Sequence, residues 1–464
     1  MVLRAILLLL GFCGAMALLV YLFAIYKQAF VFFPVIFFFS YFPIPGIGSP
    51  ERFFTMLLLV IFIMIFGVRD QKGVIDLSVF FALSLFALSF APSIYYSPIS
   101  PDKTIPVLIG RISLVVFLFL VVKNIISRRQ INDCIFGLSL LIILLLLLSI
   151  YAMIEARDIT VLRDAEEDVR FFQKGVFKYS ILNNPTLLSR IVLVCFPFIF
   201  FSFLRRPAYP WRTYYLLVLG ACVLLVFASV SKLAFGTLVL NFGILFYYFR
   251  KKEKRFFKII AVFMLVGGVL FGATLLDRFQ KMAGQAERHG TLMRFMLWTS
   301  AIKGFMEHPF LGNGPGVQAE LYQMERYGGI KLLDLVYKGK VIPRSPHNSY
   351  LSIALQGGLA SLSTFFLFVI LYGRSIYKRL KRIRISKNDL PDDYFHGFFI
   401  CSMVSLLNTL LACMFSGAYS LNIIWFLFGL GLAGVGTYRL EQKALYSKLL
   451  QESVHFDEMP IRTW

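Results

Sequence analysis

Long apolar runs recur along the whole chain and constrain its fold more than any other feature. A run of about 20 apolar residues crosses the roughly 30 Å hydrocarbon core of a membrane as a helix, because a helix satisfies its own backbone hydrogen bonds there. The chain is 58% hydrophobic and only 16% charged, whereas a water-soluble domain has about 25% charged residues. The sequence therefore predicts an all-α polytopic membrane protein of about 12–13 transmembrane helices. The predicted spans are 4–26, 28–44, 52–68, 74–96, 105–126, 131–154, 180–204, 213–229, 231–249, 256–275, 348–373, 395–413 and 420–438.

Basic clusters lie in every second loop and predict the orientation of the spans. Short loops rich in Lys and Arg stay in the cytoplasm. The net charge of +22 is then explained by topology and by anionic lipid headgroups, and no nucleic-acid partner is needed. We expect a cytoplasmic C-terminus; the side on which the N-terminus lies stays open. The clusters are Lys123 with Arg128 and Arg129, Arg205 with Arg206 and Arg212, residues 250–255 and residues 374–387.

This alternation divides the chain into four parts. Residues 1–275 form a transmembrane bundle with a short extracytoplasmic loop at 155–179, and residues 347–438 form the C-terminal spans. Residues 439–464 form a cytoplasmic tail. Between the two groups of spans lies the loop 276–346, whose length is unusual for a connection and indicates function, since it contains apolar helical stretches.

The loop 276–346 contains a predicted helix at 291–308, followed by a glycine-rich turn. The helix presents a broad apolar face, and Arg294 and Lys303 lie off that face. Gly312, Gly314 and Gly316 cannot extend a helix, and the amides of such a turn could receive an anion. The loop ends just before the next span, in Pro343-Arg344-Ser345-Pro346-His347-Asn348-Ser349-Tyr350-Leu351.

These motifs together resemble the signature of the bacterial O-antigen ligase and O-antigen polymerase superfamily. The resemblance implies a glycosyltransferase of the inner membrane whose active site faces the periplasm. The donor would be an undecaprenyl diphosphate-linked glycan and the acceptor either a lipid A core sugar or another lipid-linked glycan; the loop favours the ligase type. The residues that carry the resemblance are Arg294-x3-Trp298-x2-Ala301, His308-Pro309-x-Leu311-Gly312-x-Gly314-x-Gly316, His347-Asn348-x-Tyr350-Leu351 and Gly357-Gly358.

His347 is the candidate general base, because imidazole titrates near neutrality and matches the histidine of the family. Arg294 and Arg288 are candidates for holding the diphosphate, since guanidinium binds phosphate oxygens in pairs. Arg190 lies just inside a span, where a cation is costly. Arg190 could bind the donor, or its side chain could reach the membrane–water interface. The same two alternatives hold for Arg111. After the span at 213–229 the family commonly has Ser-Arg, but here Ser231 precedes Lys232, which keeps the charge and loses the paired geometry.

The sequence contains no carboxylate pair with motif context, so we expect a single inverting displacement. Asp102 alone does not make a metal site, and we expect transfer without metal or cofactor. The six cysteines lie in apolar stretches and are interpreted as packing residues. The competing class is a transporter or flippase of a lipid-linked or anionic substrate, in which the arginines line a route and no bond forms.

Overall fold

The structure is a computed structural model. It describes residues 74–160, 185–205, 209–229, 231–250, 285–327, 346–385, 393–415 and 422–457, together with the single positions 258, 262 and 265. The spans expected at 4–26, 28–44 and 52–68, and nearly all of 256–275, lie outside the described residues, as does the loop 161–179. The principal elements are α4 (Leu77–Leu88), η2 (Pro92–Ile94), α5 (Pro101–Asn124), α6 (Arg128–Thr160), α8 (Pro185–Arg205), α9 (Trp211–Ala228), α10 (Lys232–Phe249), α12 (Gln285–Glu307), α13 (Val317–Arg326), α15 (Ser349–Ile385), α16 (Asp393–Met414) and α17 (Asn422–Asp457).

Seven helical stretches in this part of the chain are long and apolar enough to cross a membrane. They confirm the all-α polytopic class and coincide with predicted spans. Two shorter apolar helices, Trp211–Phe227 and Leu233–Phe249, coincide with two further ones. The seven stretches are Leu77–Ile94, Pro101–Asn124, Arg128–Ile150, Leu188–Arg205, Ser349–Ile383, Asp393–Met414 and Ile423–Ser447.

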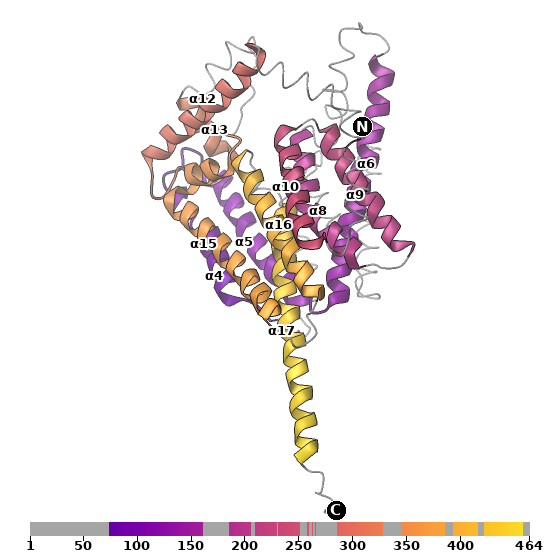
Figure 1. The fold of residues 1–464 in the computed structure, drawn as a ribbon. Helices are drawn as coiled ribbons and strands as arrows, with labels where there is room; N and C mark the ends of the chain where they lie inside the picture. Colours follow the sequence, from indigo (N-terminus) through magenta and orange to yellow (C-terminus); the bar gives the residue numbers. More distant parts are fainter. Residues whose placement is uncertain are drawn as a thin grey trace, which may run out of the picture.

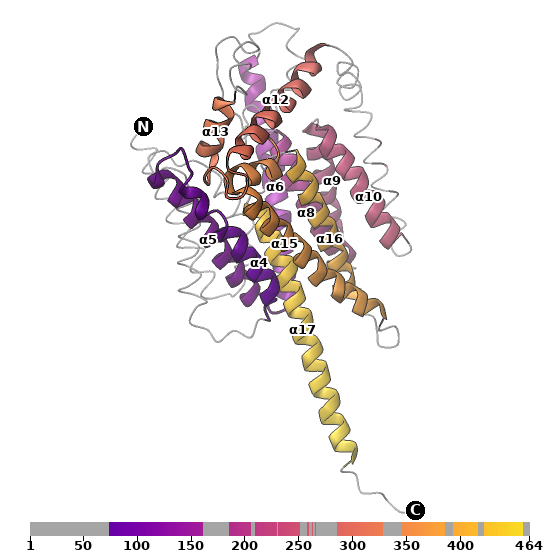
Figure 2. The ribbon, with the colours of Figure 1, turned by 90° about the vertical axis from the view of Figure 1, so that its left-hand side faces the viewer.

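Successive helices run up and down, so that each end of the bundle collects alternate loops. At one end Arg128 and Arg205 both lie over the ring of Tyr394, 4.9 and 5.3 Å from its centroid, which brings two of the basic clusters together. At the other end lie the start of α15 and the two loop helices, α12 and α13 (Figure 1). Two perpendicular views agree that α12 and α13 lie at the end opposite to the one from which α17 projects (Figure 2).

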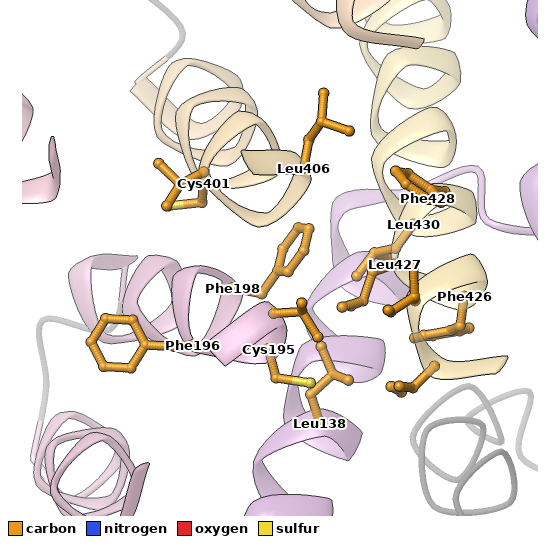
Figure 3. Packing of buried hydrophobic residues seen from close by; sticks show 14 of the residues in the cluster. Leu138, Cys195, Phe196, Phe198, Cys401, Leu406, Phe426, Leu427, Phe428 and Leu430 are labelled. Atoms are coloured by element: carbon orange, nitrogen blue, oxygen red, sulfur yellow. The ribbon is translucent and has the colours of Figure 1, made fainter. Parts of the chain in front are cut away.

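Aromatic side chains fill much of the space between α8, α16 and α17. Phe198 of α8 meets Phe398 of α16 with ring centroids 5.7 Å apart, and Phe428 of α17 belongs to the same buried cluster, part of which Figure 3 shows. The described cysteines, all but Cys13, are buried thiols in the same apolar surroundings, as predicted. Such an interior contacts little lipid, so the relative positions of the helices are fixed by side-chain packing.

Helix α17 is longer than the predicted span. It continues without interruption to Asp457, through much of the region expected to be a tail at 439–464. Where it leaves the bundle, the Nε of Arg128 donates to both carboxylate oxygens of Glu441 at 2.9 and 3.0 Å. Arg439 pairs with Asp76 at 3.3 Å. Two ion pairs therefore fasten α17 to α6 and to the start of α4 at the basic end.

Candidate functional site

The turn that bears His347 is held from both sides. On one side, the indole Nε1 of Trp298 on α12 donates to the carbonyl oxygen of Pro346 at 2.9 Å. On the other, the side-chain oxygen of Asn348 accepts the backbone N–H groups of Tyr350 and Leu351 at 3.0 and 3.1 Å, which caps α15. Between them, half-buried His347 has a φ of +51°. A non-glycine residue in this left-handed region is uncommon and occurs preferentially at functional sites.

Two arginines from separate helices converge beside this turn. Arg190 on α8 donates through Nη2 to the carbonyl oxygen of Phe415 at 3.0 Å, and its charge and that of Arg294 on α12 are close enough to repel each other. The charge of Arg190 also interacts with Cys413 of α16, whose thiol shares a hydrogen bond with the Ser349 hydroxyl. Ser349 begins α15 two residues after His347. Two repelling cations beside a half-buried histidine form an environment that favours an anionic ligand.

A small pocket lies between α8, α10 and α16 and contains Arg190 in its wall. Ser231 caps α10 at the pocket, accepting the N–H of Ala234 at 3.4 Å, so the positive end of the α10 dipole also faces this region. Asn408 is 2% exposed, and its side-chain oxygen has no hydrogen-bond partner among the described residues. The pocket therefore offers positive charge beside a buried polar side chain. It is lined by Arg190, Leu193, Ser231, Leu233, Ala234, Thr237, Asn408 and Ala412.

The other predicted cations are placed as follows. Lys232 is the first residue of α10 and Arg288 lies on α12, but the side chains of both are outside the described residues. Arg111 does not line the Arg190 pocket. Its guanidinium lies 3.4 Å above the ring of Phe90, and Nη2 donates to the side-chain oxygen of Gln356 on α15 at 2.6 Å. Arg111 is thus a link between α5, α4 and α15.

The glycine-rich turn has a different role from the one expected. Its amides do not point into an anion site, because protein acceptors already occupy them: Asn313 and Gly314 donate to the carbonyls of Leu355 and Gln356 at 2.9 and 3.1 Å. Gly316 donates to the Gln356 side chain at 2.9 Å. The expectation that this turn receives an anion is therefore wrong. The turn binds α15 instead.

Helix α15 is broken where the glycine turn binds it. Gly358 has φ +67° and ψ −165°, a conformation open essentially only to glycine. Across the break, the N–H groups of Leu359 and Ala360 donate to the carbonyls of Pro309 and Phe310 at 2.7 and 3.2 Å. The loop backbone thus replaces the helix hydrogen bonds that are missing at the break. The nine residues before the break, 349–357, form a short separate helix.

Beneath the turn lies a buried polar cluster. Glu320 of α13 is 2% exposed and accepts two hydrogen bonds, from the Ser352 hydroxyl at 2.9 Å and from the Gln356 amide at 2.8 Å. Burial raises the pKa of Glu320 to about 7, although both hydrogen bonds and the charge of Arg111 act to lower it. This carboxyl therefore changes its charge near neutral pH.

Sequence reasoning missed Glu320, Gln356 and Asn408. In α13 the polar side chains Glu320 and Gln323 face inward, while the apolar Val317 and Tyr322 are 59% and 43% exposed. An amphipathic reading of this helix would choose the wrong face. On α12, Ile302 and Met306 belong to the apolar face that the sequence predicts to lie on the membrane surface or to pack over the bundle, and they are 48% and 68% exposed.

Comparison with known proteins gives one family match. Residues 215–367 match the O-antigen ligase family, Wzy_C. This match supports membership of the O-antigen ligase superfamily. At family level, the match supports a membrane glycosyltransferase of the O-antigen ligase or polymerase type. No curated protein sequence matches it significantly. The matched stretch runs from α9 into α15 and contains the glycine turn, Arg294 and His347, while Arg190 and Arg111 precede it.

Proposed function

We propose that this O-antigen ligase superfamily member transfers a glycan from an undecaprenyl diphosphate-linked donor to a sugar hydroxyl of the lipid A core. Transfer would take place on the periplasmic side of the bacterial inner membrane, without metal or cofactor. The observation that carries the proposal is the convergence of Arg190 and Arg294 next to the turn that bears His347. A departing diphosphate needs cations, and an acceptor hydroxyl needs a base. The two arginines and the histidine lie at the same end of the bundle.

In the proposed reaction, His347 takes the proton of the acceptor hydroxyl as its oxygen attacks the anomeric carbon of the donor sugar. The bond from that carbon to the diphosphate breaks in the same step, and the anomeric configuration inverts. Undecaprenyl diphosphate leaves with the electron pair. Arg190 and Arg294 stabilise the negative charge that develops on the leaving oxygen.

The pocket between α8, α10 and α16 supports placing the diphosphate there. Arg190 brings a fixed positive charge, held by the Phe415 carbonyl, and the start of α10 adds a partial one. Arg294 is exposed on α12, so it can approach the diphosphate from the loop side.

The test uses purified full-length protein in detergent with a synthetic undecaprenyl diphosphate oligosaccharide, with and without a lipid A core acceptor. We expect one shifted acceptor product, resolved by gel and mass spectrometry. His347→Ala should lower the rate about 10²–10⁴-fold, the usual contribution of a general base. His308→Ala is the matched control, because His308 lies in the same loop, stacks on Tyr96 and contributes only its backbone carbonyl to the turn.

The other outcomes separate the alternatives. A ladder of products from donor alone would assign the chain to the polymerase type, with the same residues at work. Donor binding without any new glycosidic bond would refute the transferase proposal and favour a transporter or flippase. Chelation of divalent ions should leave the product yield unchanged, and complete loss of product would refute transfer without metal.

A further inference from the structure

Glu320 is the one buried carboxylate on α13, and no step of the proposed reaction uses it. It lies on a helix of the large loop, yet its two acceptor bonds both go to α15, the helix that follows His347. A buried carboxylate is costly unless it is fully hydrogen-bonded. Its retention at the junction between loop and bundle calls for an explanation.

The hydrogen bonds of Glu320 lead directly to the His347 turn. One carboxylate oxygen accepts the Ser352 hydroxyl at 2.9 Å, and the backbone N–H of Ser352 donates to the carbonyl of Asn348 at 2.9 Å. Asn348 is the residue after His347. Glu320 therefore holds the first turn of α15. The residues just before this turn are held by Trp298, which donates to the carbonyl of Pro346.

A second route joins the same carboxylate to the glycine turn. The other oxygen of Glu320 accepts the Gln356 amide at 2.8 Å, which fixes the orientation of that side chain. The Gln356 oxygen is then directed at two donors, Nη2 of Arg111 at 2.6 Å and the backbone N–H of Gly316 at 2.9 Å. Gly316 precedes α13 directly, so the network closes on the helix that carries Glu320.

We propose that Glu320 is a positioning residue for the transfer, acting through Ser352 and Asn348 to hold His347 in its left-handed conformation. This inference rests on the proposed role of His347. Because the helix break at Gly358 separates residues 349–357 from the rest of α15, that short segment depends on the loop network for its place. Glu320 sets that place without touching the substrate.

The test compares two serine substitutions on one helix. Ser352→Ala removes the bond to Glu320, while Ser361→Ala removes a bond of similar length, 2.8 Å to Ser89, deeper in the bundle. We expect Ser352→Ala to lower kcat at least about tenfold with the donor KM unchanged, and to increase hydrogen exchange of residues 346–352. Ser361→Ala should leave kcat within about twofold even if both variants lose equal thermal stability.

Glu320 variants supply the rescue. Glu320→Gln can accept from Gln356 and donate to Ser352, so we expect near wild-type kcat, whereas Glu320→Ala should match Ser352→Ala. Equal kcat for the two serine variants, or equal loss in both Glu320 variants, would overturn the proposal. Unchanged hydrogen exchange of residues 346–352 in Ser352→Ala would overturn the positioning role of Glu320, whichever reaction the protein catalyses. Full transfer by His347→Ala would instead refute the role of His347 alone, and the exchange measurement would still report on positioning.

Discussion

Replacing Gly358 by alanine tests how firmly the loop and the broken helix depend on each other. A Cβ at Gly358 would lie 2.3 Å from the backbone carbon and oxygen of Phe310 and 2.6 Å from the N of Leu311, and these backbone atoms cannot rotate away. The residue would also keep φ +67° and ψ −165°, which costs a non-glycine residue about 1–3 kcal/mol.

The clash has to push the loop away from α15. The bonds from Leu359 and Ala360 to Pro309 and Phe310 would then weaken, each worth about 0.5–1.5 kcal/mol. We therefore expect Gly358→Ala to lower the free energy of unfolding by about 2–6 kcal/mol. Transfer activity should fall with it, because the displaced loop binds Leu355 and Gln356 in the short helix that follows His347.

The assay is thermal unfolding of the full-length protein in detergent, beside Gly373→Ala in the same helix. A Cβ at Gly373 meets only the Leu406 side chain at 3.6 Å, an ordinary contact, so alanine there should be neutral or stabilising by about 0.5–1 kcal/mol. If Gly358→Ala unfolds at the same temperature as Gly373→Ala, the reasoning that the loop backbone completes α15 is refuted.

Three further predictions follow from single contacts. The pKa of Glu320 is raised from 4.5 to about 7, so between these pH values the folded state binds a proton that the unfolded state releases. The free energy of unfolding should therefore fall as pH rises from 4.5 to about 7. Glu320→Gln should remove this pH dependence in thermal unfolding at several pH values. Asn348→Ala should cost about 1 kcal/mol of stability through loss of the α15 cap, measured by thermal unfolding beside Asn348→Asp, which keeps the cap. Arg128→Lys should loosen α17 through loss of the paired contact with Glu441, seen as faster hydrogen exchange of residues 436–446, while transfer remains unchanged.

The spans and the site turn were predictable from sequence for different reasons. Apolar run length predicts where a helix crosses the membrane, so α5, α6 and α16 appear close to their expected bounds. The motif around His347 and the motif position of Trp298 came through resemblance to a family. In the structure the Trp298 indole contacts the Pro346 carbonyl, which gives that motif position a physical function.

The loop network was not predictable, because its partners are distant in sequence. Nothing in the sequence around Gly314 indicates that its N–H donates to the carbonyl of Gln356 and not to an anion. Glu320 would be taken for a surface residue on any scale of polarity. It becomes a buried group only because α13 is packed between the loop and α15. Long-range pairing of polar groups leaves no periodic signal in the chain.

The break in α15 also bears on how a bulky glycan could reach the site. The glycine turn supplies backbone partners to the helix at four places, through Asn313, Gly314, Pro309 and Phe310. Lifting the turn like a lid in every catalytic cycle would leave those groups unsatisfied, at about 1–3 kcal/mol each. We therefore expect the turn to stay bound to α15 throughout the catalytic cycle of the proposed reaction.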